Sequence, residues 1–144
     1  MRDSLGRGTM PVRFHAPFVQ TSEEDWGTLI VLSADETLEA ERYLMIQRKP
    51  SFSEEDRKFG MNDVYIETCG QGWSWYGHID SFRLFPNRVI VQLDATAAAE
   101  MRDTGLIEVS FALPPEQLAA LREALQRAFE GRAYYTDVSN RGHR

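Results

Sequence analysis

The segment from Asp63 to Asp94 constrains the fold of this chain more than any other part. Apolar and polar residues alternate along it and turn residues interrupt it, which predicts three consecutive strands. Val64, Ile66 and Thr68 share one predicted face, and Pro86-Asn87 marks a turn before the last of these strands. Large apolar residues gather in between: Trp73, Trp75, Tyr76, Ile79, Phe82 and Phe85. A strand meander with this aromatic elbow, residues 73–82, favours a scaffold that presents a binding surface over one that encloses a reaction.

The strands and helices predicted on either side of this segment define the fold class. Further strands are predicted over Val12–Gln20, Trp26–Ser33, Arg42–Arg48 and Ile107–Ala112. Ser53 and Asp94 have side chains suited to capping short helices. A longer amphipathic helix follows Pro114, with leucines at three- and four-residue spacing. The sequence therefore predicts an α+β fold. Six or seven mostly antiparallel strands are covered on one face by the C-terminal helix, with one or two short helices in connections.

Length and periodicity predict how the chain is divided. With 144 residues it is long enough to bury a core as one domain, which we assign to residues 12–131. Residues 1–11 are polar and residues 132–144 show no periodicity, so we expect a flexible leader and a flexible tail. Pro11 and Pro17 favour an edge position for the strand Val12–Gln20. Edge pairing with a second copy would give a homodimer, although the prolines oppose it.

Charge and cysteine content narrow the classes of partner. A net charge of −6 argues against non-specific binding to nucleic acid, which requires a cationic surface. The single cysteine excludes an internal disulfide framework and is typical of a reducing compartment. No apolar run is long enough to span a membrane, and the N-terminal residues lack the apolar core of a secretory signal. We therefore expect a cytoplasmic protein with no nucleic-acid or membrane partner.

The residues that carry chemistry are too scattered to predict an enzyme. His15, His78 and His143 lie far apart and lack zinc-ligand spacing, so we expect no metal. The sharpest catalytic alternative is a Cys69–His78 dyad oriented by Asp80 and brought together by a hairpin. Lone cysteines in strands are more often small buried apolar residues. We expect no enzymatic activity, no catalytic residues and no cofactor.

The aromatic elbow is the first candidate for binding another protein. Trp73, Trp75 and Tyr76 belong to the residue types that dominate interface energetics, and His78 follows them closely. The alternative is that two of the three aromatic side chains pack beneath the loop and close one end of the core. The prediction of a binding role for the elbow therefore depends on which of them is exposed.

An acidic band is the second candidate. Every ionisable residue from Glu23 to Glu41 is acidic. Its first members, Glu23, Glu24 and Asp25, are expected to steer a basic partner towards this face. The alternative is a set of loops kept soluble by their carboxylates. Composition alone favours that alternative.

Four motifs follow one another along the chain: Tyr43–Gln47, Ser53–Met61, Tyr65–Glu67 and Tyr76–Asp80. In this order they resemble the immunity protein 10 family of bacterial polymorphic toxin systems. The family pattern has a Tyr-Leu/Ile-x-Leu/Ile-Gln strand, an acidic turn ending in Gly-Met, a Tyr-x-Glu strand and a glycine-rich elbow. The resemblance covers about residues 12–130. His78 departs from the small residue that the family places there.

The resemblance implies a small cytoplasmic protein that binds the C-terminal domain of a cognate toxin and prevents self-intoxication. The implied mechanism is stoichiometric occlusion, and the resemblance supplies neither catalytic residues nor a cofactor. One alternative from another class remains: a small-ligand or regulatory module that uses the elbow 73–82 as one wall of a pocket. The Cys69/His78 enzyme is the less favoured third possibility.

Overall fold

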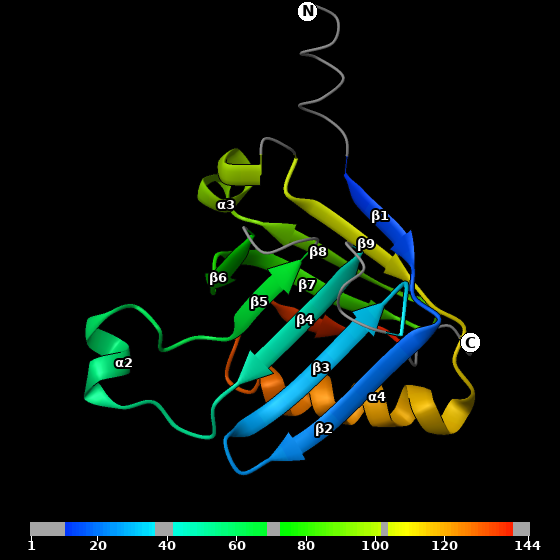
Figure 1. The fold of residues 1–144 in the computed structure, drawn as a ribbon, viewed down its shortest axis with the longest axis horizontal. Helices are drawn as coiled ribbons and strands as arrows, with labels where there is room; N and C mark the ends of the chain where they lie inside the picture. Colours follow the sequence, from blue (N-terminus) through cyan, green and yellow to red (C-terminus); the bar gives the residue numbers. More distant parts are fainter. Residues whose placement is uncertain (1–10, 37–41, 69–72, 102–103, 140–144) are drawn as a thin grey trace, which may run out of the picture.

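The computed structural model describes residues 11–36, 42–68, 73–101 and 104–139. Within these residues the chain forms ten strands in two five-stranded sheets, together with three helices (Figure 1). Most strand pairs are antiparallel, so the predicted α+β class is confirmed. The predicted number of six or seven strands is wrong. Two stretches that the sequence pattern treats as continuous divide between the sheets, and a further strand forms after the last helix.

Sheet B is an antiparallel meander in which each strand pairs with the next along the chain. Its strands are β2 (Phe18–Glu24), β3 (Gly27–Ser33), β4 (Tyr43–Arg48), β5 (Tyr65–Thr68) and β6 (Ser74–Tyr76). The alternation of side chains sets two faces. Ile30 and Ile46 are paired across β3 and β4 and are fully buried, whereas Met45 and Tyr65 on the other face are only half-buried. We call the half-buried face the outer face of sheet B, and Figure 1 looks onto it.

Sheet A has the strand order β1-β9-β8-β7-β10. Its strands are β1 (Val12–His15), β7 (Ile79–Phe85), β8 (Arg88–Leu93), β9 (Leu106–Ser110) and β10 (Tyr135–Asp137). The two edge strands are parallel to their neighbours, β1 to β9 and β10 to β7, while the three inner strands are antiparallel. In Figure 1 this sheet lies behind sheet B.

Two short joints carry the chain from one sheet to the other. The predicted strand Val12–Gln20 breaks at Pro17, which lacks an N–H for the ladder, and its two halves become edge strands of different sheets. The second joint is Gly77-His78, between β6 and β7. Both residues have positive φ, 78° and 60°, a left-handed conformation that glycine adopts readily and histidine adopts at a cost. The aromatic elbow is therefore the place where the chain changes sheets.

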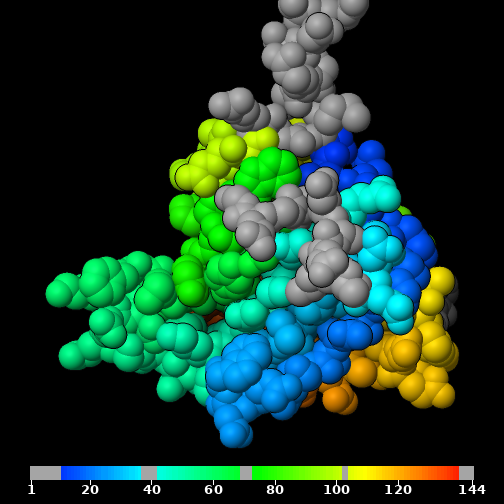
Figure 2. All heavy atoms as spheres, viewed as in Figure 1, coloured from blue at the N-terminus to red at the C-terminus, as the bar shows by residue number. Residues whose placement is uncertain are grey.

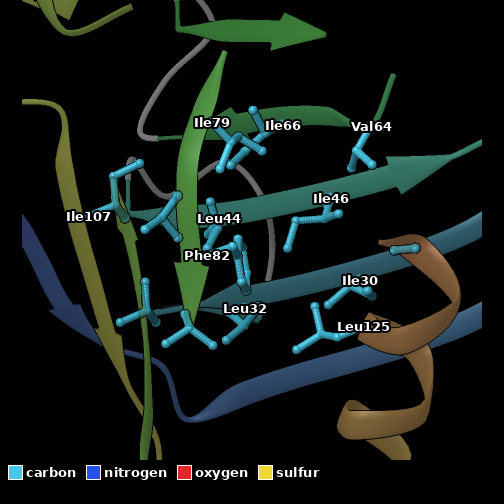
Figure 3. Packing of buried hydrophobic residues seen from close by; sticks show 14 of the residues in the cluster. Ile30, Leu32, Leu44, Ile46, Val64, Ile66, Ile79, Phe82, Ile107 and Leu125 are labelled. Carbon is cyan, nitrogen blue, oxygen red and sulfur yellow. The ribbon is translucent and has the colours of Figure 1, made fainter. Parts of the chain in front are cut away.

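The core lies between the two sheets and is closed at one end by helix α4 (Pro115–Ala128). Leu121, Ala124 and Leu125 of this helix are completely buried, and α4 lies against β2, β3 and β4. Figure 3 shows Leu125 beside Ile30 of β3, and Phe82 of β7 between the two sheets. The C-terminal helix thus contacts the inner face of sheet B, while sheet A covers the rest of that face.

The segment 49–63 joins β4 to β5 and projects away from both sheets, as Figures 1 and 2 show; we call it the arm. It contains α2 (Glu54–Lys58), which begins with a capping box. The Ser53 hydroxyl accepts a hydrogen bond from the Asp56 N–H, and the Asp56 carboxylate accepts one from the Ser53 N–H. A third helix, α3 (Ala95–Met101), follows Asp94, whose carboxylate accepts a hydrogen bond from the Ala97 N–H.

The residues after α4 are part of the sheet structure. A flexible tail was expected over 132–144, but in its described part, up to residue 139, the chain forms β10 and buries Ser139 completely. Tyr135 in β10 stacks on Phe129 with ring centroids 5.0 Å apart. This aromatic contact packs β10 against the core, and the sequence pattern did not predict it. The expected leader, residues 1–11, lies outside the described residues except for Pro11.

Candidate functional site

The structure divides the predicted aromatic elbow between the core and the surface. Trp75 points to the inner face of sheet B, is only 8% exposed, and donates a hydrogen bond from Nε1 to Glu100 Oε1 at 2.7 Å. Trp73 is partly buried against the same core. Tyr76 is 36% exposed and lies on the outer face beside Tyr65, with ring centroids 5.2 Å apart. Two of the three aromatic residues therefore pack into the fold, and Tyr76 alone faces outwards.

His78 pairs with a residue other than the one predicted. Its Nδ1 lies 2.8 Å from Asp94 Oδ2, whereas Asp80 is exposed and has no hydrogen-bond partner in the described residues. Burial raises the pKa of Asp94, but the hydrogen bonds from the Ala97 N–H and from His78 outweigh it and lower that pKa overall. His78 thus lies in the joint between the sheets and pairs with Asp94, the residue that caps α3. Cys69, the other half of the alternative dyad, lies outside the described residues.

The three acidic residues of the β2–β3 hairpin differ in their surroundings. Glu23 accepts hydrogen bonds from the Thr28 hydroxyl and from Arg127 of α4, and these two contacts lower its pKa. Glu24 and Asp25 are exposed and have no hydrogen-bond or ion-pair partner in the described structure. These two are therefore the acids of this hairpin that remain available to a partner. Residues 37–41 of the band lie outside the described residues.

The remaining carboxylates near sheet B have structural partners. Asp56 is buried and accepts a hydrogen bond from Lys49 Nζ at 2.8 Å. Glu67 accepts hydrogen bonds from the hydroxyls of Tyr43 and Tyr65 on the outer face. Within the described residues, no group of three or more His, Cys, Asp and Glu side chains is placed to hold a metal ion. Asp56 and Glu67 are therefore held by contacts within the fold.

An aromatic hollow lies where the arm meets the outer face of sheet B. Its volume is about 120 Å³. It is lined by Trp26, Gln47, Lys49, Phe52, Met61, Asp63, Tyr65 and Tyr76. Trp26 comes from the β2–β3 turn, Gln47 from β4, Tyr65 from β5 and Tyr76 from β6, and the arm supplies Phe52 and Met61, so five separate parts of the chain contribute walls. Figure 2 shows the arm standing out from the molecular surface next to the hairpin.

The exposed aromatic residues gather around this hollow. Among the described residues, the large apolar side chains classed as exposed are Trp26, at 46%, Phe59, at 62%, and Tyr76. Trp26 and Tyr76 line the hollow, and Phe59 follows α2 on the arm. Exposed apolar groups that cluster in this way mark interaction sites more often than single ones do. The sequence pattern missed Trp26, Phe52 and Met61, because only the tertiary fold brings the β2–β3 turn and the arm to Tyr76. It also missed the exposure of Phe59.

Two ion pairs hold the walls of the hollow in place. Lys49, at the end of β4, fixes Asp56 of α2, and this hydrogen bond lowers the pKa of Asp56 and raises that of Lys49. At the other end of the arm, Asp63 Oδ1 accepts hydrogen bonds from Arg132 Nε at 2.9 Å and from the Tyr134 hydroxyl at 3.1 Å. Burial and the nearby Asp63 raise the pKa of Tyr134, so its hydroxyl stays protonated and continues to donate. The arm is therefore braced at both of its ends.

Comparison with known proteins gives a family. The family model described as Immunity protein 10 matches residues 15–119, most of the chain, and the chain therefore belongs to this family. The matched range includes both sheet B and the arm. The search of curated proteins found no match. No helix in the described parts of the chain is long and apolar enough to cross a membrane.

Proposed function

We propose that this member of the immunity protein 10 family neutralises a cognate bacterial toxin by binding its C-terminal domain in a stoichiometric complex and covering its functional surface. The family membership is the observation that carries the proposal. The chain acts in the cytoplasm in this account and makes or breaks no covalent bond. The toxin domain is its partner, with no nucleic acid or membrane involved.

The aromatic hollow supports a binding role more directly than the elbow as a whole. Tyr76 is the one aromatic residue of the predicted set that reaches the surface, and Trp26 joins it from the β2–β3 turn. Tryptophan and tyrosine are the residue types that most often dominate binding energy. Glu24 and Asp25 precede Trp26 directly, so the available acids lie next to the aromatic residues. Trp73 and Trp75 support the proposed site from the core, and Glu23 and His78 support it through their surface contacts with Arg127 and Asp94.

The size of the hollow favours a protein partner over a metabolite. Small-molecule sites usually enclose about 300–1,000 Å³, whereas this hollow has about 120 Å³. It accommodates one side chain of a partner but encloses little of a drug-sized ligand. The elbow 73–82 also offers no separate ligand wall in its described part, because Trp75 belongs to the core.

The edge strands leave the homodimer as a separate proposal. Among the described residues, β1 and β2 end their sheets, so each has one row of backbone groups without a strand partner there. Analytical ultracentrifugation over a range of protein concentrations measures this directly. A single species of monomer mass would remove the dimer and leave toxin binding untouched.

The direct test is inhibition of the toxin by titration. The C-terminal domain encoded by the neighbouring toxin gene is purified, and its activity is measured as the chain is added. Activity is expected to fall linearly and reach zero at one chain per domain, because occlusion is stoichiometric. An unrelated toxin domain serves as the control. Failure to co-purify with the neighbouring gene product, or loss of toxin activity at far below one equivalent, would refute the mechanism.

A further inference from the structure

The aromatic hollow continues into a second hollow on the same side of the molecule. The second hollow has a volume of about 200 Å³ and lies over β2, β3 and β4. Phe18, Leu29, Val31 and Met45 give it an apolar floor, and these four side chains all belong to the outer face of sheet B. Gln47 lines both hollows, so the two are neighbours along one face. Phe18, Leu29 and Met45 are half-buried and Val31 is 8% exposed, and we call these residues, together with the aromatic hollow, the strip.

Carboxylates without ion-pair partners border this strip at both ends. Asp35 and Glu36 line the second hollow, while Glu24 and Asp25 precede Trp26 in the β2–β3 turn and line a separate hollow that also includes Arg48, Lys49 and Arg127. Among the described residues, none of these four side chains has a hydrogen-bond or ion-pair partner. The single cation that lines the aromatic hollow or the second hollow is Lys49, and Asp56 holds it at 2.8 Å. These four carboxylates therefore give this side of the molecule negative charge that no ion pair within the described residues neutralises.

The opposite side of the molecule has the reverse charge. The outer side of sheet A carries Arg13, Arg83 and Arg88; its acids are Glu108, between Arg13 and Arg88, and the exposed Asp80 of β7. Glu108 Oε1 accepts a hydrogen bond from Arg13 Nε at 3.1 Å, and Glu108 Oε2 lies 3.8 Å from Arg88 Nε. Arg83 lies over the ring of Phe85 and has no carboxylate partner in the described structure. A charged partner therefore distinguishes the two outer faces before any contact forms.

The outer face of sheet B is smaller than the area that a tight protein interface buries. Five strands about 4.8 Å apart and about six residues long give a face of roughly 24 by 20 Å, or about 480 Å². A tight protein complex buries about 800 Å² on each partner. The sheet alone is too small, so the interface must extend over the arm and the β2–β3 turn. Those are the two places where Phe59 and Trp26 are exposed.

We propose that the outer face of sheet B, together with the arm and the β2–β3 turn, is the surface that binds the toxin domain, and that it receives a basic protein surface which inserts a cationic side chain, arginine above all, into the aromatic hollow. This inference rests on the proposed function. The faces of Trp26 and Tyr76 attract a guanidinium through cation–π contact, and its aliphatic stem packs against Met61. Glu24 and Asp25, which directly precede Trp26 in the turn, supply carboxylates for further cationic groups of the same basic surface.

The test compares matched variants on the two sides of the molecule. Trp26→Ala and Tyr76→Ala remove the aromatic walls, and Phe85→Ala on sheet A is their control. The double variant Asp25→Lys/Glu36→Lys reverses charge at both ends of the strip. Asp80→Lys/Glu123→Lys is its control, because these two carboxylates are also exposed and without ion-pair partners. The probe is the purified C-terminal domain of the neighbouring toxin, and binding is followed by surface plasmon resonance over a range of salt concentrations.

Trp26→Ala and Tyr76→Ala are each expected to weaken binding by about 30-fold or more, as hot-spot residues do. The Asp25/Glu36 double variant is expected to slow association by about 10-fold at low salt and to flatten its salt dependence. The control variants should stay within about twofold of the unaltered chain. Each variant should keep the melting temperature of the unaltered chain within a few degrees, since the substituted side chains are exposed or half-buried. Circular dichroism checks this.

The outcomes separate this inference from the proposed function. If the unaltered chain does not bind the toxin domain, the proposed function is wrong and the inference falls with it. If it binds tightly and the sheet B variants bind equally well, the function stands and the assigned face is wrong. Loss of binding in Phe85→Ala or in Asp80→Lys/Glu123→Lys would place the interface away from the outer face of sheet B. If the charge variants associate at an unchanged rate at all salt concentrations, the inference of a basic partner surface is wrong.

Discussion

Replacing Trp75 by alanine is expected to cost the chain much of its stability and little of its intrinsic affinity for a partner. The side chain is 8% exposed on the inner face of sheet B. A tryptophan buries about 150–250 Å², and at about 25 cal/mol per Å² its loss corresponds to roughly 4–6 kcal/mol. Measured truncations of buried aromatic residues cost about 3–5 kcal/mol. We therefore expect a loss of about 3–5 kcal/mol in the free energy of unfolding.

Urea denaturation followed by circular dichroism measures that loss. For a chain of this size the melting temperature should fall by about 10–15 °C. Trp75→Phe separates two contributions, because it keeps a ring in the core but removes the hydrogen bond from Nε1 to Glu100. It should cost about 1–2 kcal/mol, the range of one hydrogen bond to a partly solvated carboxylate.

Tyr76→Ala is the matched control on the same strand. It should change stability by less than about 1 kcal/mol, because it loses mainly its contact with Tyr65. Binding of the toxin domain is measured at low temperature, where all the variants are folded. An unchanged melting temperature in Trp75→Ala, combined with a binding loss of about 30-fold, would refute the division of the elbow between core and surface.

Four further predictions concern the parts that hold the binding face in place. Ser53→Ala removes the cap of α2 and should cost about 1 kcal/mol, seen as faster amide exchange confined to the arm; exchange that spreads over both sheets would contradict an independent arm. Arg48→Met removes hydrogen bonds to the carbonyls of Ala128 and Glu130 at the end of α4, and urea denaturation should show a loss of about 2 kcal/mol in the free energy of unfolding. Arg127→Met is the comparison: it removes a surface ion pair with Glu23 and should cost less than about 1 kcal/mol. Gly77→Ala should be more destabilising than Gly60→Ala, because both have positive φ but only at Gly77 does a Cβ meet Asp63 Oδ2, at 2.6 Å; equal melting temperatures would refute this reading. The pKa values of Glu23, Asp56 and Asp94 are lowered in the folded chain, so these carboxylates contribute fully to the free energy of unfolding above about pH 5. That contribution is lost as the pH falls through the unfolded pKa values, near 4, towards the folded ones. Calorimetry should show the melting temperature falling in this pH range, and falling less in Asp56→Asn.

Local patterns were sufficient to predict the class of the fold and most of its elements. The continuous apolar run of β3, the alternation in β4, β5 and β8, and the leucine spacing of α4 reflect contacts that each segment makes along its whole length. The caps at Ser53 and Asp94 were also predictable, because a capping side chain bonds to residues only a few positions away.

The division into two sheets was not predictable in the same way. The strand Val12–Gln20 keeps its alternation across Pro17, and the two halves separate only because their partners, β9 and β3, lie in different sheets. The joint at Gly77-His78 depends on backbone angles that a histidine seldom adopts. β10 has too few residues for a periodic pattern, and it forms because Tyr135 packs on Phe82 and Phe129.

The candidate site shows the same limit. Tryptophan and tyrosine near the glycines of the elbow were identified as binding residues by type, but their burial follows from strand pairing. Trp75 lies opposite the buried Ile66, whereas Tyr76 lies opposite Tyr65 on the outer face. Trp26 was read as the start of a strand, and only the approach of the arm to the β2–β3 turn makes it part of a hollow. Residue type thus predicts the chemistry of an interface, and tertiary contacts decide which residues supply it.

Hydroxyl-radical footprinting of the chain, alone and with one equivalent of the toxin domain, tests the account most directly. The method oxidises accessible tryptophan, methionine and tyrosine side chains, and the proposed face contains Trp26, Met45, Met61 and Tyr76. Oxidation at these four positions is expected to fall several-fold in the complex, while His15 and Phe85 on sheet A keep their rates. Unchanged oxidation at Trp26 and Tyr76, with protection at His15 and Phe85, would contradict the claim that this chain acts by covering its partner with the outer face of sheet B.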